Sequence, residues 1–278
     1  MRQQTRTARA LMGKRAGPDE DGNKFWLDFL TRGPSIELRL RKVLTHLPGG
    51  PRCKLCAAPF SGIGGPMMRA IGKRPSNVSP SICQTCVSFL QSHRGGAEVP
   101  CSLLFADIRG STTMAERMTP TEYRAIAARF YATATKAVFS HDGELHQFVG
   151  DQLVALFIPL LAGEQHAARA VETALSLLRE TGHADAGGPW LPIGAGVHTG
   201  PTWLGAVGDD DHVDLSAFGD SMNITARLAS TARAGEILVT AEAAAAARLD
   251  SGWERRQLAL KGRHAPTEVV SLQVPAPT

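Results

Sequence analysis

Hydrophobic and polar positions follow different patterns before and after about residue 100. Residues 24–47 form short amphipathic helical stretches interrupted at Gly33-Pro34, and residues 51–94 show little regular periodicity. Beyond that point strand-like and helix-like segments alternate. The pattern predicts strands over 101–108, 144–149, 152–158, 193–199, 214–218, 236–240, 256–260 and 269–272, and helices over 120–139, 164–181, 220–232 and 241–249. This order predicts an α+β sandwich in which helices cover a mainly antiparallel sheet.

Two local signals fix boundaries within this pattern. Thr119-Pro120-Thr121-Glu122 matches a capping box with proline at the first helical position, so a helix is expected to begin there. Gly150-Asp151 lies between two apolar runs and indicates a hairpin turn. We therefore expect Asp151 at the tip of that hairpin.

Charge is distributed unevenly along the 278 residues, although the formal net charge is only +4. Residues 1–100 carry 16 basic and 6 acidic residues, whereas the remainder carries 14 basic and 20 acidic residues. The basic half could meet nucleic acid, an acidic partner or a membrane surface, but the absence of interleaved aromatic residues favours a solvated arm with an unknown partner. No apolar run approaches the roughly 18 residues of a membrane helix, and no secretory signal is evident, so a cytoplasmic location is expected.

These patterns divide the chain into three parts. Residues 1–23 are polar, rich in turn-forming residues and expected to form a disordered basic tail. Residues 24–96 are expected to hold a helical segment and a small cysteine module, ending in a linker at His93–Gly96. Residues 97–278 carry the predicted sandwich.

The cysteine module is defined by two Cys-x-x-Cys pairs. The pairs are Cys53 with Cys56 and Cys83 with Cys86, separated by 26 residues. Two such pairs can supply four thiolates in a tetrahedron, which is the ligand set of structural zinc. An iron–sulfur cluster or a redox switch remains an alternative, whereas Cys101 is expected to be a small buried apolar residue.

Carboxylates follow the first predicted strand and the hairpin. Asp107 ends an apolar strand and precedes the turn Ile108-Arg109-Gly110-Ser111-Thr112, which opens toward a helix whose N-terminus would favour a phosphate. If the hairpin lies beside that strand, Asp107 and Asp151 project from one sheet end and could hold two hard cations. Without such a neighbour, Asp107 would be read as a turn cap and Asp151 as part of a common turn dipeptide.

Asn223 and Arg227 are four residues apart on one predicted helix and therefore share a face. An amide and a guanidinium can bind a ribose and a phosphate, although a solvated polar face is the alternative interpretation.

Four blocks together resemble the class III adenylate and guanylate cyclase family. They are FADIRGST at 105–112, FVGDQLVALF at 148–157, HTG at 198–200 and FGDSMNITARL at 218–228, and LKG at 260–262 adds a fifth. Their order and spacing match the family over roughly 101–273. The resemblance implies a ferredoxin-like cyclase sandwich that works as a homodimer with two Mg²⁺ or Mn²⁺ ions per active site.

The resemblance also implies roles for individual residues. Asp107 and Asp151, with the main chain at Ile108, match the metal-binding positions. Asn223 matches the asparagine that orients the ribose, and Arg227 the arginine that stabilises the transition state. Lys261 matches the lysine that binds the terminal phosphates. In the family the metal aspartates of one chain meet the Asn/Arg pair of the other.

Two positions depart from the family pattern where the base is selected. Gln147 stands where adenylate cyclases usually have Lys, and Ser216 where they usually have Asp. Both side chains can donate and accept hydrogen bonds, so they could read adenine or guanine. The expected activity is conversion of ATP to 3′,5′-cyclic AMP and pyrophosphate. A guanylate or relaxed-specificity cyclase, or a catalytically weak nucleotide-binding signalling module, is the alternative.

Overall fold

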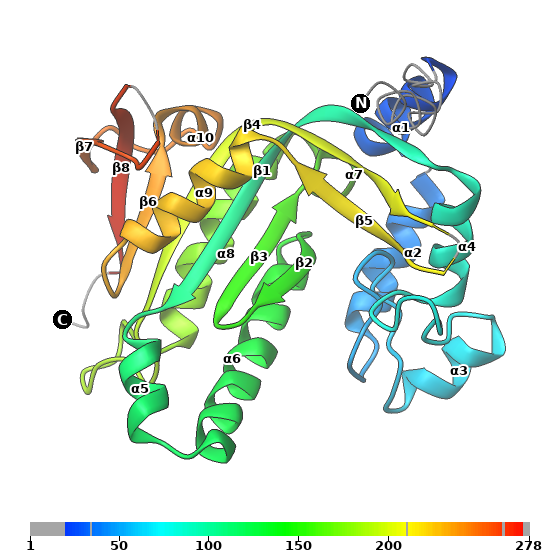
Figure 1. The fold of residues 1–278 in the computed structure, drawn as a ribbon, viewed down its shortest axis with the longest axis horizontal. Coiled ribbons are helices and arrows are strands. Elements are labelled where there is room, and N and C mark those ends of the chain that lie inside the picture. The colour runs from blue at the N-terminus through cyan, green and yellow to red at the C-terminus, as the bar shows by residue number, and fades with distance from the viewer. Residues whose placement is uncertain (1–19, 34, 210, 263–264, 275–278) are drawn as a thin grey trace, which may run out of the picture.

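The computed structural model describes residues 20–33, 35–209, 211–262 and 265–274. These residues form one eight-stranded mixed sheet with helices on its faces (Figure 1). The strands are β1 Gly95–Ile108, β2 Glu144–Val149, β3 Gln152–Phe157, β4 Ile193–Gly208, β5 Val213–Phe218, β6 Glu236–Thr240, β7 Glu254–Leu258 and β8 Thr267–Gln273. Their order is β2-β3-β1-β4-β6-β8-β7, with β5 paired to β4 outside this path. Every pair is antiparallel except β4 with β6. The predicted α+β class is confirmed.

The helices fall largely where the hydrophobic pattern predicts them. They are α1 Glu20–Thr31, α2 Ser35–His46, α3 Gly64–Ala70, α4 Gln84–Ser92, α5 Ser111–Arg117, α6 Pro120–Ser140, α7 Pro159–Ala162, α8 His166–Glu180, α9 Asp220–Thr231 and α10 Ala241–Ala246, with a 3-10 turn at Gly163–Gln165. The predicted capping box is present at the start of α6, where Thr119 and Glu122 bond reciprocally. None of the described helices is both long enough and apolar enough to cross a membrane.

Helices α6, α8 and α10 cover one face of the sheet. Phe130 of α6 and Leu177 of α8 are fully buried there with Leu104 of β1 and Val197 of β4. The apolar positions of α8 recur at helical spacing, and they form the buried side of that helix. This layer leaves the opposite face of β1, β3 and β4 for other elements to cover.

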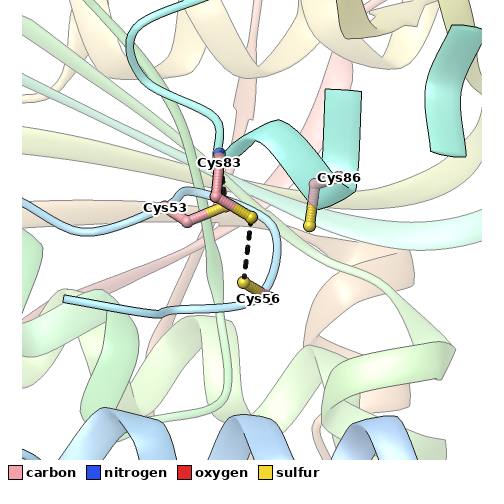
Figure 2. A group of neighbouring side chains, drawn as sticks. All are labelled: Cys53, Cys56, Cys83 and Cys86. Carbon is pink, nitrogen blue, oxygen red and sulfur yellow. Dashed lines mark hydrogen bonds between the residues drawn. The ribbon is translucent and has the colours of Figure 1, made fainter. Parts of the chain in front are cut away.

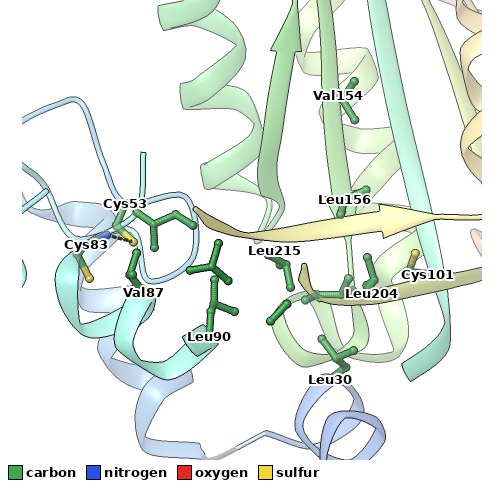
Figure 3. Close-up of a cluster of buried hydrophobic side chains, with 14 of the residues drawn as sticks. Leu30, Cys53, Cys83, Val87, Leu90, Cys101, Val154, Leu156, Leu204 and Leu215 are labelled. Atoms are coloured by element: carbon green, nitrogen blue, oxygen red, sulfur yellow. Dashed lines mark hydrogen bonds between the residues drawn. The ribbon is translucent and has the colours of Figure 1, made fainter. Parts of the chain in front are cut away.

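The N-terminal module, residues 20–33 and 35–94, covers part of the opposite face (Figures 1 and 3). It packs there against the paired ends of β4 and β5. Leu30, Val87 and Leu90 of the module share a core with Val154 of β3 and Leu215 of β5. The module and the sheet are therefore joined by one buried apolar cluster. The domain boundary expected at residue 97 stays a prediction.

Helix α9 lies on the same face as the module and approaches β4 very closely at Gly196. A Cβ atom added to Gly196 would lie 2.5 Å from Leu228 Cβ and 2.6 Å from Ala229 N. Only glycine leaves room for the helix at this distance. This close approach fixes the position of the helix that carries Asn223 and Arg227.

Several predicted boundaries were wrong, and pairing between distant strands explains most of them. The strand predicted at 101–108 begins earlier, at Gly95, and so includes the last two residues of the linker expected at 93–96. It starts there because Gly95 and Gly96 pair with Ala206 and Gly205 of β4. β4 likewise continues to Gly208 through its pairing with β5. Residues 51–94 contain α3 and α4, and α1 begins at Glu20, within the tail expected to be disordered. The rest of that tail, 1–19, lies outside the described residues.

Candidate functional site

Asp107 and Asp151 lie together at one end of the sheet. Asp107 is the penultimate residue of β1 and pairs with Gln152, the first residue of β3, so the turn with Asp151 lies beside it. Burial raises the pKa of Asp107 above its ordinary value, Arg109 opposes the rise, and the charge and hydrogen bond of Asp151 add to it. A carboxylate whose ionisation is opposed by a neighbouring carboxylate is stabilised by a cation placed between the two.

A tyrosine on α6 holds the turn that carries Asp151. The Tyr131 hydroxyl donates a hydrogen bond to the carbonyl of Gly150, and its ring stacks on Phe148 at a centroid distance of 3.9 Å. Gly150 has a φ of +61°, a left-handed conformation that favours glycine. No sequence pattern had singled out Tyr131, since it appeared as one more aromatic residue on a helix.

The turn after Asp107 was expected to face a phosphate, but its Arg109 side chain is bound within the protein. The Arg109 guanidinium pairs with the Asp107 carboxylate and also donates to the carbonyls of Ser230 and Ala232 at 3.0 and 3.3 Å. Arg109 therefore ties the end of β1 to the end of α9. The Ile108 side chain is buried, so only its main chain can face a ligand.

The remaining residues of the expected phosphate turn begin a short helix. Gly110 has a φ of +72° and precedes α5, and Ser111 and Thr112 form the first turn of that helix. Both side chains line a shallow hollow with Tyr123, whose pKa is raised by burial and by the nearby charge of Asp151. The hollow therefore lies next to the paired aspartates.

A second group of expected site residues gathers around α9. Asn223 is exposed and Arg227, one turn later, is half-buried. The Arg227 guanidinium lies against Gly262, because a Cβ atom there would be 3.2 Å from Nη2. Lys261, the preceding residue, is exposed. The structure thus brings the expected transition-state arginine beside the expected phosphate-binding lysine.

The two groups remain separate within one chain. Among the described residues, no hydrogen bond or ion pair links either aspartate to Asn223, Arg227 or Lys261.

The two positions that were expected to select the base lie on strands outside both groups. Gln147 is exposed on β2, next to a register shift between Leu145 and Gln147. It lines a groove of about 1140 Å³ between α6, β2 and the N-terminal module, together with Lys54 and Asp214. Ser216 is half-buried on β5. Lys54 and Asp214 had no signal in the sequence, because they are 160 residues apart.

The four predicted ligand cysteines form one cluster (Figure 2). Cys53 and Cys56 lie on a loop before α3, Cys83 is the cap of α4, and Cys86 lies in its first turn. Their sulfur atoms all lie within 4.8 Å of one another, and Cys56 Sγ is 3.7 Å from Cys83 Sγ. All four are free thiols, because a disulfide needs about 2.05 Å. Sulfurs around a tetrahedral zinc ion, with bonds of about 2.3 Å, are separated by about 3.8 Å.

Hydrogen bonding within the cluster pulls the thiol pKa values apart. Hydrogen bonds with neighbouring thiols lower the pKa of Cys56 and raise the pKa of Cys86. The Lys73 ammonium donates to Cys56 Sγ at 3.6 Å, and the main-chain N–H of Cys83 donates to Cys53 Sγ at 3.3 Å. These donors stabilise thiolates, and a divalent cation would allow all four groups to ionise. The cluster fits one tetrahedral metal ion.

Cys101, the remaining cysteine, is fully buried on β1 as predicted. Burial raises its pKa to about 11. It is not part of the metal-ligand cluster and serves as an internal control for thiol chemistry.

We expect purified protein to carry about one zinc ion per chain, because four clustered thiolates favour zinc and metal binding contributes to folding. Cys56→Ala should lose the ion and unfold at lower temperature, whereas Cys101→Ala should keep the full metal content. Elemental analysis with inorganic sulfide determination, combined with thermal unfolding, measures both. Iron with sulfide, or a folded wild type without metal, would contradict the assignment.

Comparison with known proteins places these observations in a family. The model of the adenylate and guanylate cyclase catalytic domain matches residues 97–271. Adenylate cyclase 1 of Rhizobium meliloti is 30% identical over 130 residues, which are 45% of this chain and 20% of that protein. Adenylate cyclase of Anabaena cylindrica is 31% identical over 131 residues, 46% of this chain and 26% of that protein. The matches thus span about a quarter or less of these relatives.

Solved structures agree on the fold. The guanylyl cyclase Cya2 is 26% identical with a TM-score of 0.58, covering 64% of this chain and 93% of that structure. The adenylyl cyclase CyaB from P. aeruginosa has a TM-score of 0.56 at 24% identity, covering 66% and 97%. The family model matches more than half of the chain, and this match identifies the protein as a member of the adenylate and guanylate cyclase catalytic domain family.

Proposed function

We propose that the chain is an adenylate cyclase that converts ATP to 3′,5′-cyclic AMP and pyrophosphate at the interface of a homodimer. The observation that carries the proposal is that the carboxylates of Asp107 and Asp151 lie together at the end of β1. The same chain also carries Asn223, Arg227 and Lys261. The two similar adenylate cyclases named above support the choice of nucleotide.

In the proposed reaction the ribose 3′-oxygen attacks the α-phosphorus. A new P–O bond forms, the bond to the β-phosphate oxygen breaks, and pyrophosphate leaves while the hydroxyl proton passes to solvent. Two Mg²⁺ or Mn²⁺ ions held by Asp107, Asp151 and the Ile108 main chain would lower the pKa of the attacking hydroxyl and neutralise the triphosphate. Arg109 would have to release Asp107 for this purpose.

The partner chain would supply the other half of the site. Asn223 would bind the ribose and keep the 3′-hydroxyl in line with the α-phosphorus. Arg227 would stabilise charge that develops on the phosphoryl oxygens, and Lys261 would bind the leaving pyrophosphate. Ser111 and Thr112 would line the phosphate side beside the aspartates. No step needs a covalent enzyme intermediate.

Guanylate or relaxed-specificity cyclisation is the second candidate. It is favoured by the neutral Gln147 and Ser216 at the base-selecting positions, and by the similarity to Cya2. A nucleotide-binding module without turnover is the third, and the presence of both aspartates with Asn223 and Arg227 argues against it. The cytoplasmic location, intracellular signalling and the unknown partner of the basic N-terminal arm stay predictions.

Loss of either aspartate should abolish cyclisation. We expect Asp107→Ala and Asp151→Ala each to reduce kcat by at least about a hundredfold, because the charge that holds the cations is removed. Circular dichroism and thermal unfolding check that the variants fold, and Glu172→Gln on the exposed side of α8 is the matched control. Near-normal turnover in either folded aspartate variant would disprove the assignment.

Mixing two inactive variants should restore activity. Asp107→Ala chains retain Arg227, and Arg227→Ala chains retain Asp107, so each mixed dimer has one intact site. Random exchange in an equimolar mixture should give about a quarter of wild-type activity, since half of the dimers are mixed and half of their sites are intact. Mixed dimers that are detected by native mass spectrometry and remain inactive would contradict the shared site.

Substrate choice should depend on Gln147 and Ser216. We expect a modest preference for ATP over GTP, because hydrogen bonds from neutral groups contribute less than charge-assisted ones. Gln147→Lys combined with Ser216→Asp should raise the preference by up to about tenfold, and the two changes should be non-additive. Steady-state kinetics of both single variants and the double variant measure this. A wild type that strongly prefers GTP, or a double variant with unchanged preference, would contradict it.

A further inference from the structure

Charged side chains are buried where the N-terminal module meets the sheet. Arg41 of α2 and Lys54 of the Cys53–Cys56 loop come from the module, and Glu144 of β2 comes from the sheet, as does Asp214 of β5, which is only partly buried. Arg41, Lys54 and Glu144 are 5%, 7% and 1% exposed. Charged groups are rarely buried without partners, so this cluster needs a structural or functional reason.

Lys54 is the residue that joins the module to two strands at once. Its ammonium lies 2.6 and 2.7 Å from the two carboxylate oxygens of Asp214, and it donates to the carbonyl of His146 on β2 at 3.4 Å. Arg41 makes a parallel connection, since it donates to the carbonyls of Leu55 at 3.1 Å and Gly143 at 2.7 Å. The loop between the first two cysteines is thereby fastened to β2 and β5.

The same two strands carry the residues that we assign to the nucleotide base. His146 immediately precedes Gln147, and Ser216 follows Asp214 by two residues, on the same side of β5. Gln147, Lys54 and Asp214 line one groove. Lys54 therefore connects the two strands that carry these positions.

Burial decides between two ways in which Lys54 could act. Its side chain is only 8% exposed and both Asp214 oxygens occupy its ammonium, so it does not reach a base directly. The ion pair instead holds β5 at a set distance from β2. Buried ion pairs contribute little net stability compared with apolar contacts, but they demand a particular geometry.

A metal ion in the cysteine cluster would set the position of Lys54. Lys54 is flanked by Cys53 and comes two residues before Cys56, and its own N–H donates to the carbonyl of Ser81, just before Cys83. Ligation of all four sulfurs by one ion fixes this loop, and loss of the ion frees it.

We propose that Lys54 and Asp214 form a strut through which the metal-loaded cysteine cluster positions Gln147 and Ser216 for the nucleotide base. The inference rests on the proposed function, since it deepens the base selection of that site. Lys54 is a positioning residue, and it makes nucleotide recognition depend on the metal in the N-terminal module.

The test measures binding of 3′-deoxy-ATP and 3′-deoxy-GTP, which lack the attacking hydroxyl and cannot cyclise. Lys54→Met and Asp214→Asn should each weaken binding of the preferred analogue by about 10- to 100-fold, because a small misplacement of binding groups is costly. Lys42→Met is the matched control, since Lys42 lines the same groove but is exposed, and it should bind within about twofold of wild type. Metal content and thermal unfolding are measured for every variant.

A second comparison separates positioning from stability. In a Gln147→Ala, Ser216→Ala background the added Lys54→Met change should weaken binding by less than about twofold, because the groups it positions are gone. Additive losses in that background, or a Lys54→Met variant that only unfolds earlier and binds normally, would overturn the proposal. A Gln147→Ala, Ser216→Ala variant that binds the analogues as tightly as wild type would also overturn the proposal.

Failure of the proposed function gives a different result. A wild type that forms no cyclic product but binds the analogues in a Lys54-dependent manner would defeat the cyclase assignment and support the strut. Removal of the cysteine-bound metal by a chelator, followed by return to chelator-free buffer with Mg²⁺, should reproduce the Lys54→Met binding defect in wild type. Chelated protein that stays folded and binds normally would overturn the strut while leaving cyclisation intact.

Discussion

The antiparallel pairing of β1 with β4 is the interaction on which the other features depend. Fourteen residues of β1, from Gly95 to Ile108, pair one for one with β4 from Ala206 back to Ile193. The strand begins where the N-terminal module ends and finishes at the candidate metal-binding end of the sheet. A shift of one residue in this register would exchange the side chains of its two faces. The α6–α8 layer and the module would then both lose their apolar partners.

Two covered faces place the proposed base-reading positions and the two aspartates in different parts of the sheet. One face is buried by α6, α8 and α10, and the other is shared by α9 and the module. The end of β1 remains accessible to cations. Strands β2 and β5 instead contact Lys54, which lies between the first two cysteines of the cluster. In the proposal, an ion bound to thiolates in the module would affect the base without touching the phosphates. The charged groups at this junction give it a defined geometry, which an apolar contact alone would leave less specific.

The sequence was most informative where local chemistry determines structure. The capping box at Thr119 and the hairpin at Gly150-Asp151 were correct, since each depends on residues within a few positions. The paired aspartates and the four cysteines were also brought together as expected. The extent of β1 and β4 was missed because it depends on pairing between distant segments. The Lys54–Asp214 pair had no sequence signal, because residues 160 positions apart become neighbours only in the tertiary fold. The Arg109–Asp107 pair is local, but the sequence analysis had assigned Asp107 to metal ions and Arg109 to the phosphate turn.

Identification of the product formed by the wild-type chain is the most direct test of the proposal that this protein cyclises a nucleoside triphosphate. Purified metal-loaded protein is incubated with Mn²⁺ or Mg²⁺ and either ATP or GTP, and products are identified by mass. The account predicts 3′,5′-cyclic nucleotide and pyrophosphate in equal amounts, with more product from ATP than from GTP. Folded dimeric protein that gives no cyclic nucleotide with either substrate, or only the diphosphate and phosphate, would contradict it.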